Sequence, residues 1–122
     1  MNVNELTKAE EQIMHIIWQL DECFVKEIIE ELPEPKPAYN TVSTIVRILE
    51  KKAFVNYRAF GKTHQYFPAI TKEEYAKFKT NNLLGSYFGN SAEKMMSFFI
   101  KEKKIDITQL DELLKNIKND QH

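Results

Sequence analysis

Five polar side chains recur at helical spacing between residues 40 and 51. They are Asn40, Ser43, Thr44, Arg47 and Lys51. At about 100° per residue they share one side of a helix, opposite its apolar positions. Side chains of these types hydrogen-bond to the edges of bases and to phosphates, and a helix that carries them fits the major groove of a duplex. An ordinary solvated helix face usually alternates Glu with Lys, whereas this face has no acid before Glu50.

The charge distribution points to the same region of the chain. The 122 residues carry a formal net charge of −1, but residues 36–66 hold six basic side chains and a single acid. The preceding 35 residues hold nine acids and two lysines. A local positive field attracts phosphates even on a nearly neutral protein, because exposed charges more than about 8–10 Å away are screened at physiological salt. A solvated surface without a partner remains the alternative.

Other residues that could do chemistry are few. Cys23 with His15 or His64 as its base would make a hydrolase, but a cysteine beside an apolar pair is more typical of an unreactive, half-buried thiol. The three histidines and the cysteine lack the short spacings of a zinc site, and the sequence contains no glycine-rich phosphate loop. We therefore expect no metal, no cofactor and no enzymatic activity.

Apolar periodicity predicts three helices in the first half of the chain. The first covers about 8–20, and Ile28, Ile29 and Leu32 mark the second. The third covers about 38–52, where Val42, Ile45, Val46 and Leu49 form one apolar stripe. Thr7 and Glu10 fit a capping box at the first helix. Phe24 and Val25 predict a short strand, and the prolines of 33–37 end the second helix.

The residues after the third predicted helix change in character. From 54 to 67 the sequence is rich in aromatic and β-branched residues, with Gly61-Lys62 in the middle. A two-residue turn with glycine first predicts a hairpin in which Tyr57 lies opposite Tyr66 and Arg58 opposite Gln65.

Three more helices are expected in the remainder of the chain. The first covers about 72–88 and is interrupted by Gly89-Asn90. The predicted caps are Thr71, Ser91 and Thr108. Eight apolar residues of the last two helices need a partner, either the first domain or a second copy of the chain, and a second copy explains more. These predicted dimerisation residues are Met95, Met96, Phe98, Phe99, Leu110, Leu113, Leu114 and Ile117.

Three helices followed by a hairpin, with the basic residues on the third helix and the hairpin, are the order of a winged helix-turn-helix. We expect a mainly α fold with a small β-hairpin, divided into a DNA-binding domain over 1–70 and a helical dimerisation domain over 71–122. The residues predicted to read bases are Thr41, Ser43, Thr44 and Arg47. Those predicted to hold the DNA backbone are Lys36, Tyr39, Asn40, Lys51, Lys62, Thr63 and His64. The start of the chain lacks a secretory signal and no apolar stretch is long enough to span a membrane, so a cytoplasmic location is expected.

Several stretches carry a family resemblance. They are Leu6-Thr7-Lys8-Ala9-Glu10-Glu11 with Ile16-Ile17-Trp18, then Thr41-Val42-Ser43-Thr44-Ile45-Val46-Arg47-Ile48-Leu49-Glu50-Lys51-Lys52, and the tyrosine-rich hairpin. Together they resemble the penicillinase-repressor (BlaI/MecI) family over nearly the whole chain. The resemblance implies a homodimeric repressor that binds a palindromic operator of β-lactam-resistance or related stress genes. It also implies release from DNA when a membrane-bound sensor metalloprotease cleaves the dimerisation domain.

The chain departs from that family's pattern at three places, one of which is Arg47, one position before the family's usual arginine. The family's cleavage site is an Asn-Phe pair, which this sequence does not contain, and the matching position is Phe98-Phe99. Ala53 stands where the family usually has glycine at the end of the third helix. A different function for the same fold, docking of a protein partner without sequence-specific DNA binding, stays open at this point.

Overall fold

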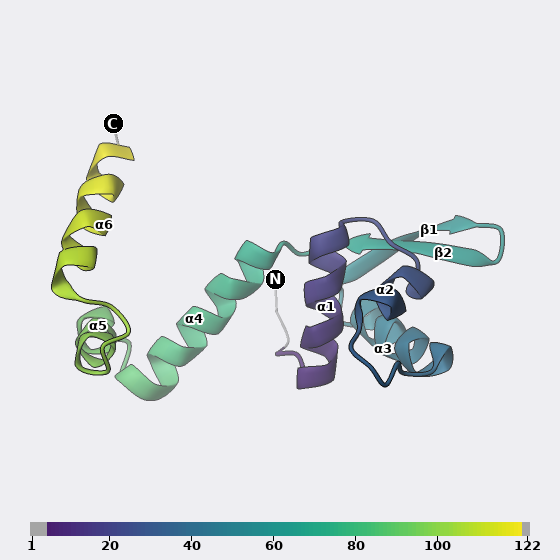
Figure 1. The fold of residues 1–122 in the computed structure, drawn as a ribbon, viewed down its shortest axis with the longest axis horizontal. Coiled ribbons are helices and arrows are strands. Elements are labelled where there is room, and N and C mark those ends of the chain that lie inside the picture. Colours follow the sequence, from purple (N-terminus) through teal and green to yellow (C-terminus); the bar gives the residue numbers. More distant parts are fainter. Residues whose placement is uncertain (1–4, 121–122) are drawn as a thin grey trace. The chain divides into compact units, whose positions relative to one another are not determined.

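The computed structural model describes residues 5–120 and is mainly helical, with one antiparallel hairpin in that range (Figure 1). The elements are α1 (Lys8–Leu20), α2 (Val25–Glu31), α3 (Tyr39–Lys51), β1 (Val55–Phe60), β2 (Thr63–Pro68), α4 (Lys72–Phe88), α5 (Ala92–Lys101) and α6 (Ile107–Asp120). The chain forms two compact units, one ending at Lys79 and the other beginning at Thr80, so α4 belongs partly to each.

Local side chains determine where the first two helices begin. At α1 the predicted capping box is confirmed, because Thr7 Oγ1 accepts from the Glu10 N–H at 3.2 Å and Glu10 Oε1 accepts from the Thr7 N–H at 3.0 Å. The strand predicted at Phe24 and Val25 is wrong. Phe24 is the N-cap of α2, and its N–H donates to the Glu27 carboxylate at 2.8 Å. This bond draws the segment into a helix one turn earlier than the apolar pattern indicates.

The hairpin has the predicted register. Tyr57 pairs with Tyr66 and Arg58 with Gln65, and Gly61 begins the turn with a φ of 63°. Cys23 extends this small sheet by one bridge, since its N–H donates to the Tyr66 carbonyl at 2.9 Å and its carbonyl accepts from the Tyr66 N–H at 2.7 Å. The segment between α1 and α2 therefore fixes the base of the hairpin.

One apolar core holds the first unit together. Its contributors come from α1, α2, α3, both strands, the start of α4 and the segments that join them. Its fully buried large side chains are Met14, Ile17, Ile28, Leu49 and Phe54. From α4, Tyr75 packs its ring against Phe54, and its hydroxyl oxygen accepts from the Leu6 N–H at 2.9 Å. The first unit therefore extends beyond residue 70, where the sequence predicts the domain boundary.

The end of α3 has a conformation that is costly for a residue with a side chain. Ala53 has a φ of 66°. Its N–H donates to the Glu50 carbonyl at 3.0 Å, and the Phe54 N–H donates to the Leu49 carbonyl at 2.9 Å. These are the two hydrogen bonds of a Schellman cap, a motif in which glycine is the usual left-handed residue. The cap expected for glycine thus forms around alanine.

The second unit has no buried core within residues 80–119. None of the residues 80–119 is buried, and Ile107 is 71% exposed. Gly89 and Asn90 both have positive φ and separate α4 from α5, which Ser91 caps as predicted. The cap predicted at Thr108 is wrong. Asp106 caps α6 instead, because its carboxylate accepts from the Gln109 N–H at 2.7 Å, and a carboxylate one residue before the helix is better placed than a hydroxyl already inside it.

Candidate nucleic-acid interface

Helix α3 presents the predicted polar face to solvent. Its opposite side is held by Val42, Val46 and Leu49, all buried in the core. This fixes the rotation of the helix about its axis. The polar residues that are exposed are Asn40, Thr41, Thr44, Arg47 and Lys51, while Ser43 is half-buried. Tyr39, at the first position of the helix, is also exposed.

The six basic residues of the 36–66 segment fall into two groups of different kind. Lys36 Nζ donates to the backbone carbonyls of Glu30 and Leu32 at 2.9 and 2.6 Å, which satisfies the end of α2. Lys52 Nζ donates to Glu10 Oε1 at 2.7 Å, beside the start of α1. Arg58 lies 3.2 Å from Glu22 Oε1. These three cations are engaged with the protein's own groups.

The other three cations are available to a ligand. Arg47 and Lys51 lie on the outer face of α3, and Lys62 lies in the hairpin turn next to the exposed Thr63. None of the three cations has an ion-pair partner among residues 5–120. The recognition surface that remains consists of one helix face and one hairpin tip.

Two aromatic rings on the hairpin were not predicted as part of the site. Tyr57 is 42% exposed and stacks on His64, with ring centroids 4.0 Å apart and planes at 10°. The half-buried His64 therefore has a ring partner inside the hairpin, in addition to its predicted place near DNA. Phe60, beside the turn, is also exposed. The predicted register, which places residues 57 and 64 on one face of the hairpin, is the signal that could have indicated this pair.

The hairpin face that carries Tyr66 is the one near α3. Burial raises the pKa of Tyr66, and the carboxylate of Glu50 adds to this effect while the guanidinium of Arg47 opposes it. Both of these charged groups belong to α3. The part of α3 that carries Arg47 and Glu50 therefore lies close to the Tyr66 face of the hairpin.

The cysteine is not a reactive centre. Cys23 is fully buried, and burial together with the charge of Glu27 raises its pKa to about 12. A thiol with this pKa is almost entirely protonated at neutral pH and is a poor nucleophile. Among the described residues, His, Cys, Asp and Glu do not gather in a group of three or more that could hold a metal ion.

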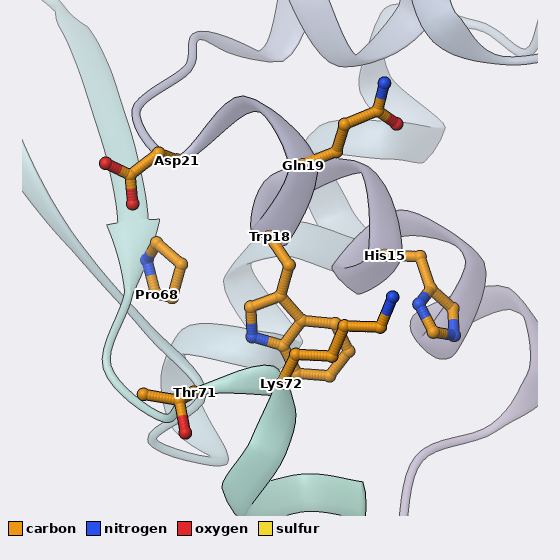
Figure 2. Close-up of a pocket in the computed structure, with 7 residues that line it drawn as sticks. All are labelled: His15, Trp18, Gln19, Asp21, Pro68, Thr71 and Lys72. Atoms are coloured by element: carbon orange, nitrogen blue, oxygen red, sulfur yellow. The ribbon is translucent and has the colours of Figure 1, made fainter.

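A shallow pocket lies away from α3, between α1, the end of β2 and the start of α4. Figure 2 shows Trp18 in its middle, with His15 on one side and Asp21 and Pro68 on the other. The Trp18 Nε1–H donates to the Ile70 carbonyl at 2.9 Å, so the indole already has its polar partner in the fold. The pocket contains none of the residues predicted to contact DNA.

The residues predicted for dimerisation lie in the second unit. Met95, Met96, Phe99 and Leu110 are half-buried within their own chain. Phe98, Leu113, Leu114 and Ile117 are exposed, each by more than two fifths. In the part of the chain that the structure describes, no helix combines the length and the apolar character needed to cross a membrane.

Comparisons with known proteins agree with this geometry. The sequence model described as Penicillinase repressor matches residues 6–119. The penicillinase repressor of Bacillus licheniformis is 24% identical over 121 residues, which cover 96% of this chain and 94% of that protein. The methicillin resistance regulatory protein MecI of Staphylococcus aureus is 27% identical over 117 residues, 94% of each chain.

Two solved structures resemble the first part of the chain. The DNA-binding domain of the repressor BlaI has a TM-score of 0.53 and 27% identity, over 61% of this chain and 92% of that domain. The monomeric form of Bacillus licheniformis BlaI, in complex with the blaP half-operator, has a TM-score of 0.50 at the same identity and coverage. These matches confirm the winged-helix fold predicted for the N-terminal part.

Proposed function

Because this chain belongs to the penicillinase repressor family, whose members are transcriptional repressors and not enzymes, we propose that it is a homodimeric repressor that binds a palindromic DNA operator. The observation that carries the proposal is the outer face of α3, where Arg47 and Lys51 have no ion-pair partner among residues 5–120, on a helix whose rotation the core fixes. The structure of a relative with the same fold was solved in complex with a half-operator, which supports DNA as the ligand.

Each exposed group of the interface has a proposed role. Arg47 reads a base edge with its two-pronged guanidinium, and Thr41, Ser43 and Thr44 read bases beside it. The Thr44 hydroxyl donates to the Asn40 carbonyl at 2.8 Å, so toward DNA it acts as an acceptor or presents its methyl group.

The remaining residues hold the DNA backbone. They are Tyr39, Asn40 and Lys51 on the helix, and Lys62 and Thr63 at the hairpin tip, with His64 beside them. Lys36 uses two of its three N–H donors on backbone carbonyls, so we assign it to the fold first and to a phosphate only through its third donor.

The second unit supplies the dimer contact in this proposal. An isolated helical segment in which no residue from 80 to 119 is buried has little to stabilise it, and a second copy of the same apolar surface would cover it. Two recognition helices on a two-fold axis would then meet half-sites about 34–36 Å apart, or a multiple of that distance.

Release from DNA would follow from cleavage of the second unit by a membrane-bound sensor metalloprotease, as the resemblance implies. The candidate bond joins Phe98 and Phe99, in the middle of α5. The Phe98 carbonyl accepts from the Glu102 N–H at 2.9 Å, so this helix has to open locally before a protease can bind the bond in extended form. Mass spectrometry after co-expression with such a protease tests this step, which predicts one fragment ending at Phe98 and another beginning at Phe99.

The experiment that tests the main proposal is selection of bound sequences from a random duplex pool at physiological salt, with the mass of the complex measured on the same sample. An enriched palindrome and a dimeric mass are expected. A monomer that enriches no sequence and binds all duplexes with a Kd of about 10⁻⁴–10⁻⁶ M would instead favour a winged-helix module that docks a protein.

A further inference from the structure

The chain has two arginines, and the structure gives them opposite surroundings. Arg47 on α3 has no ion-pair partner among the described residues, whereas Arg58 on β1 lies 3.2 Å from Glu22 Oε1. Arg58 also lies over the ring of Phe67, with its guanidinium carbon 5.1 Å from the ring centroid. One side chain therefore contacts both the neighbouring strand and the segment between α1 and α2.

The register of the hairpin places this cluster on the face away from Tyr66. Arg58, Phe67 and Phe60 alternate with Tyr57 and Tyr66, so the two sets point to opposite faces of the sheet. The Tyr66 face is the one near Arg47 and Glu50 of α3. On the other face, the ring of Phe60 lies 6.1 Å from that of Phe24, which comes two residues after Glu22.

These contacts connect the hairpin to the turn that precedes α2. The backbone bridge between Cys23 and Tyr66 fixes the base of the hairpin, and the pair of Arg58 with Glu22 lies further out toward its tip. Figure 1 shows the two strands extending beyond α2 and α3, so a small change of angle at the base would move the tip by a larger distance.

We propose that Glu22 withholds Arg58 from DNA, so that Arg58 positions the hairpin, and that Glu22 thereby sets how strongly the protein prefers its operator over other duplexes. The inference rests on the proposed function. A guanidinium released on the hairpin would bind phosphate on any sequence, because phosphate contacts carry no sequence information. Glu22 therefore favours specificity by removing one non-specific cation from each subunit.

The pair is exposed, which makes the proposal testable by charge removal. With 59% of the Arg58 side chain in solvent, the ion pair adds little stability, and Glu22→Gln should leave the fold intact. The matched control is Glu31→Gln, which removes the same charge from the same acidic segment at an exposed residue with no partner among the described residues. This control separates the effect of releasing Arg58 from the effect of weaker electrostatic repulsion between the acidic segment and DNA.

The experiment measures Kd against salt for the selected operator and for an unrelated duplex, after circular dichroism has shown that each variant is folded. For Glu22→Gln we expect tighter binding to the unrelated duplex and a log–log salt slope steeper by about 0.9 per subunit. The control should keep the original slope, Arg58→Gln should also keep it, and the double variant should return to it. Lys62→Gln, at a proposed phosphate contact, should reduce it by about 0.9 per subunit.

Two results would overturn the inference alone. One is a Glu22→Gln variant that behaves like Glu31→Gln. The other is a loss of about 0.9 per subunit in the slope of Arg58→Gln, which would make Arg58 a phosphate contact in the native protein. If the unchanged chain binds neither duplex at any salt concentration, the proposed function fails and takes this inference with it.

Discussion

At the scale of single residues, the structure separates cations that build the fold from cations that are free to bind. The sequence puts six basic residues in one segment, but the partners of Lys52 and Arg58 are Glu10 and Glu22, which lie before that segment. Local spacing contains no information about such distant pairs. The three free cations were nevertheless all among the predicted DNA contacts, whereas the engagement of Lys36 with backbone carbonyls could not be predicted.

The pair of Glu10 and Lys52 leads to a pH-dependent prediction. Burial acts to raise the pKa of Glu10, but the hydrogen bond and charge of Lys52, with the Thr7 amide, lower it below its usual value. A depressed carboxyl pKa stabilises the fold above the unfolded value of about 4.3 and loses this effect as the pH falls through the folded pKa. Glu10→Gln should lower the free energy of unfolding by about 1–3 kcal/mol at neutral pH.

Urea unfolding of both proteins at neutral and acidic pH checks this prediction. The difference between them should shrink in acid, once the native carboxyl is protonated. A difference that stays constant from neutral pH to about pH 3 would show that the charge of Glu10 does not contribute.

Among the helices and strands, the sequence predicts a turn or a cap correctly where a hydroxyl or a glycine marks the position. The Thr7 cap, the Ser91 cap and the register set by Gly61-Lys62 are confirmed. The errors at Phe24 and Thr108 share one feature, because in both helices the N–H of the actual N-cap, Phe24 or Asp106, donates to an acidic or amide side chain three residues later. The apolar pattern shows where a helix packs and is less informative about where it begins.

Ala53 provides a prediction at this scale. A left-handed residue with a Cβ costs about 1 kcal/mol relative to glycine, so Ala53→Gly should raise the free energy of unfolding by about that amount without touching the interface. Ala59→Gly, in an extended strand, is the matched control and should lower it. Chemical denaturation measures both, and a destabilised Ala53→Gly protein would mean that the cap does not have this conformation in solution.

At the scale of the whole molecule, the two units differ in how much they bury. The first unit is stabilised by its own apolar core, whereas none of the residues 80–119 of the second unit is buried in the single chain. The sequence could predict that the C-terminal helices need a partner, since their apolar residues form stripes. It could not show which of these residues contact their own chain, as the ring of Phe98 contacts that of Phe88 at 5.5 Å.

The dimer contact is tested by a charge placed in the apolar stripe of α6. Leu113→Glu should produce a monomer and lower the affinity for the full operator by about 10²–10⁴, because linked binding of two half-sites is lost, while affinity for a half-site is kept. Asn119→Glu adds the same charge on the opposite side of the helix and should remain dimeric. Sedimentation and DNA titration of both variants decide the matter, and a dimeric Leu113→Glu protein would exclude α6 from the contact.

In the proposed repressor the outer face of α3 reads DNA sequence, and Arg47 is its most specific residue. The most direct test measures Kd of the native chain and of Arg47→Ala for the selected operator and for an unrelated duplex at one salt concentration. We expect Arg47→Ala to lose about 1–3 kcal/mol, or about 5- to 150-fold, on the operator and to change little on the unrelated duplex. Equal weakening on both duplexes, or no weakening on either, would contradict it.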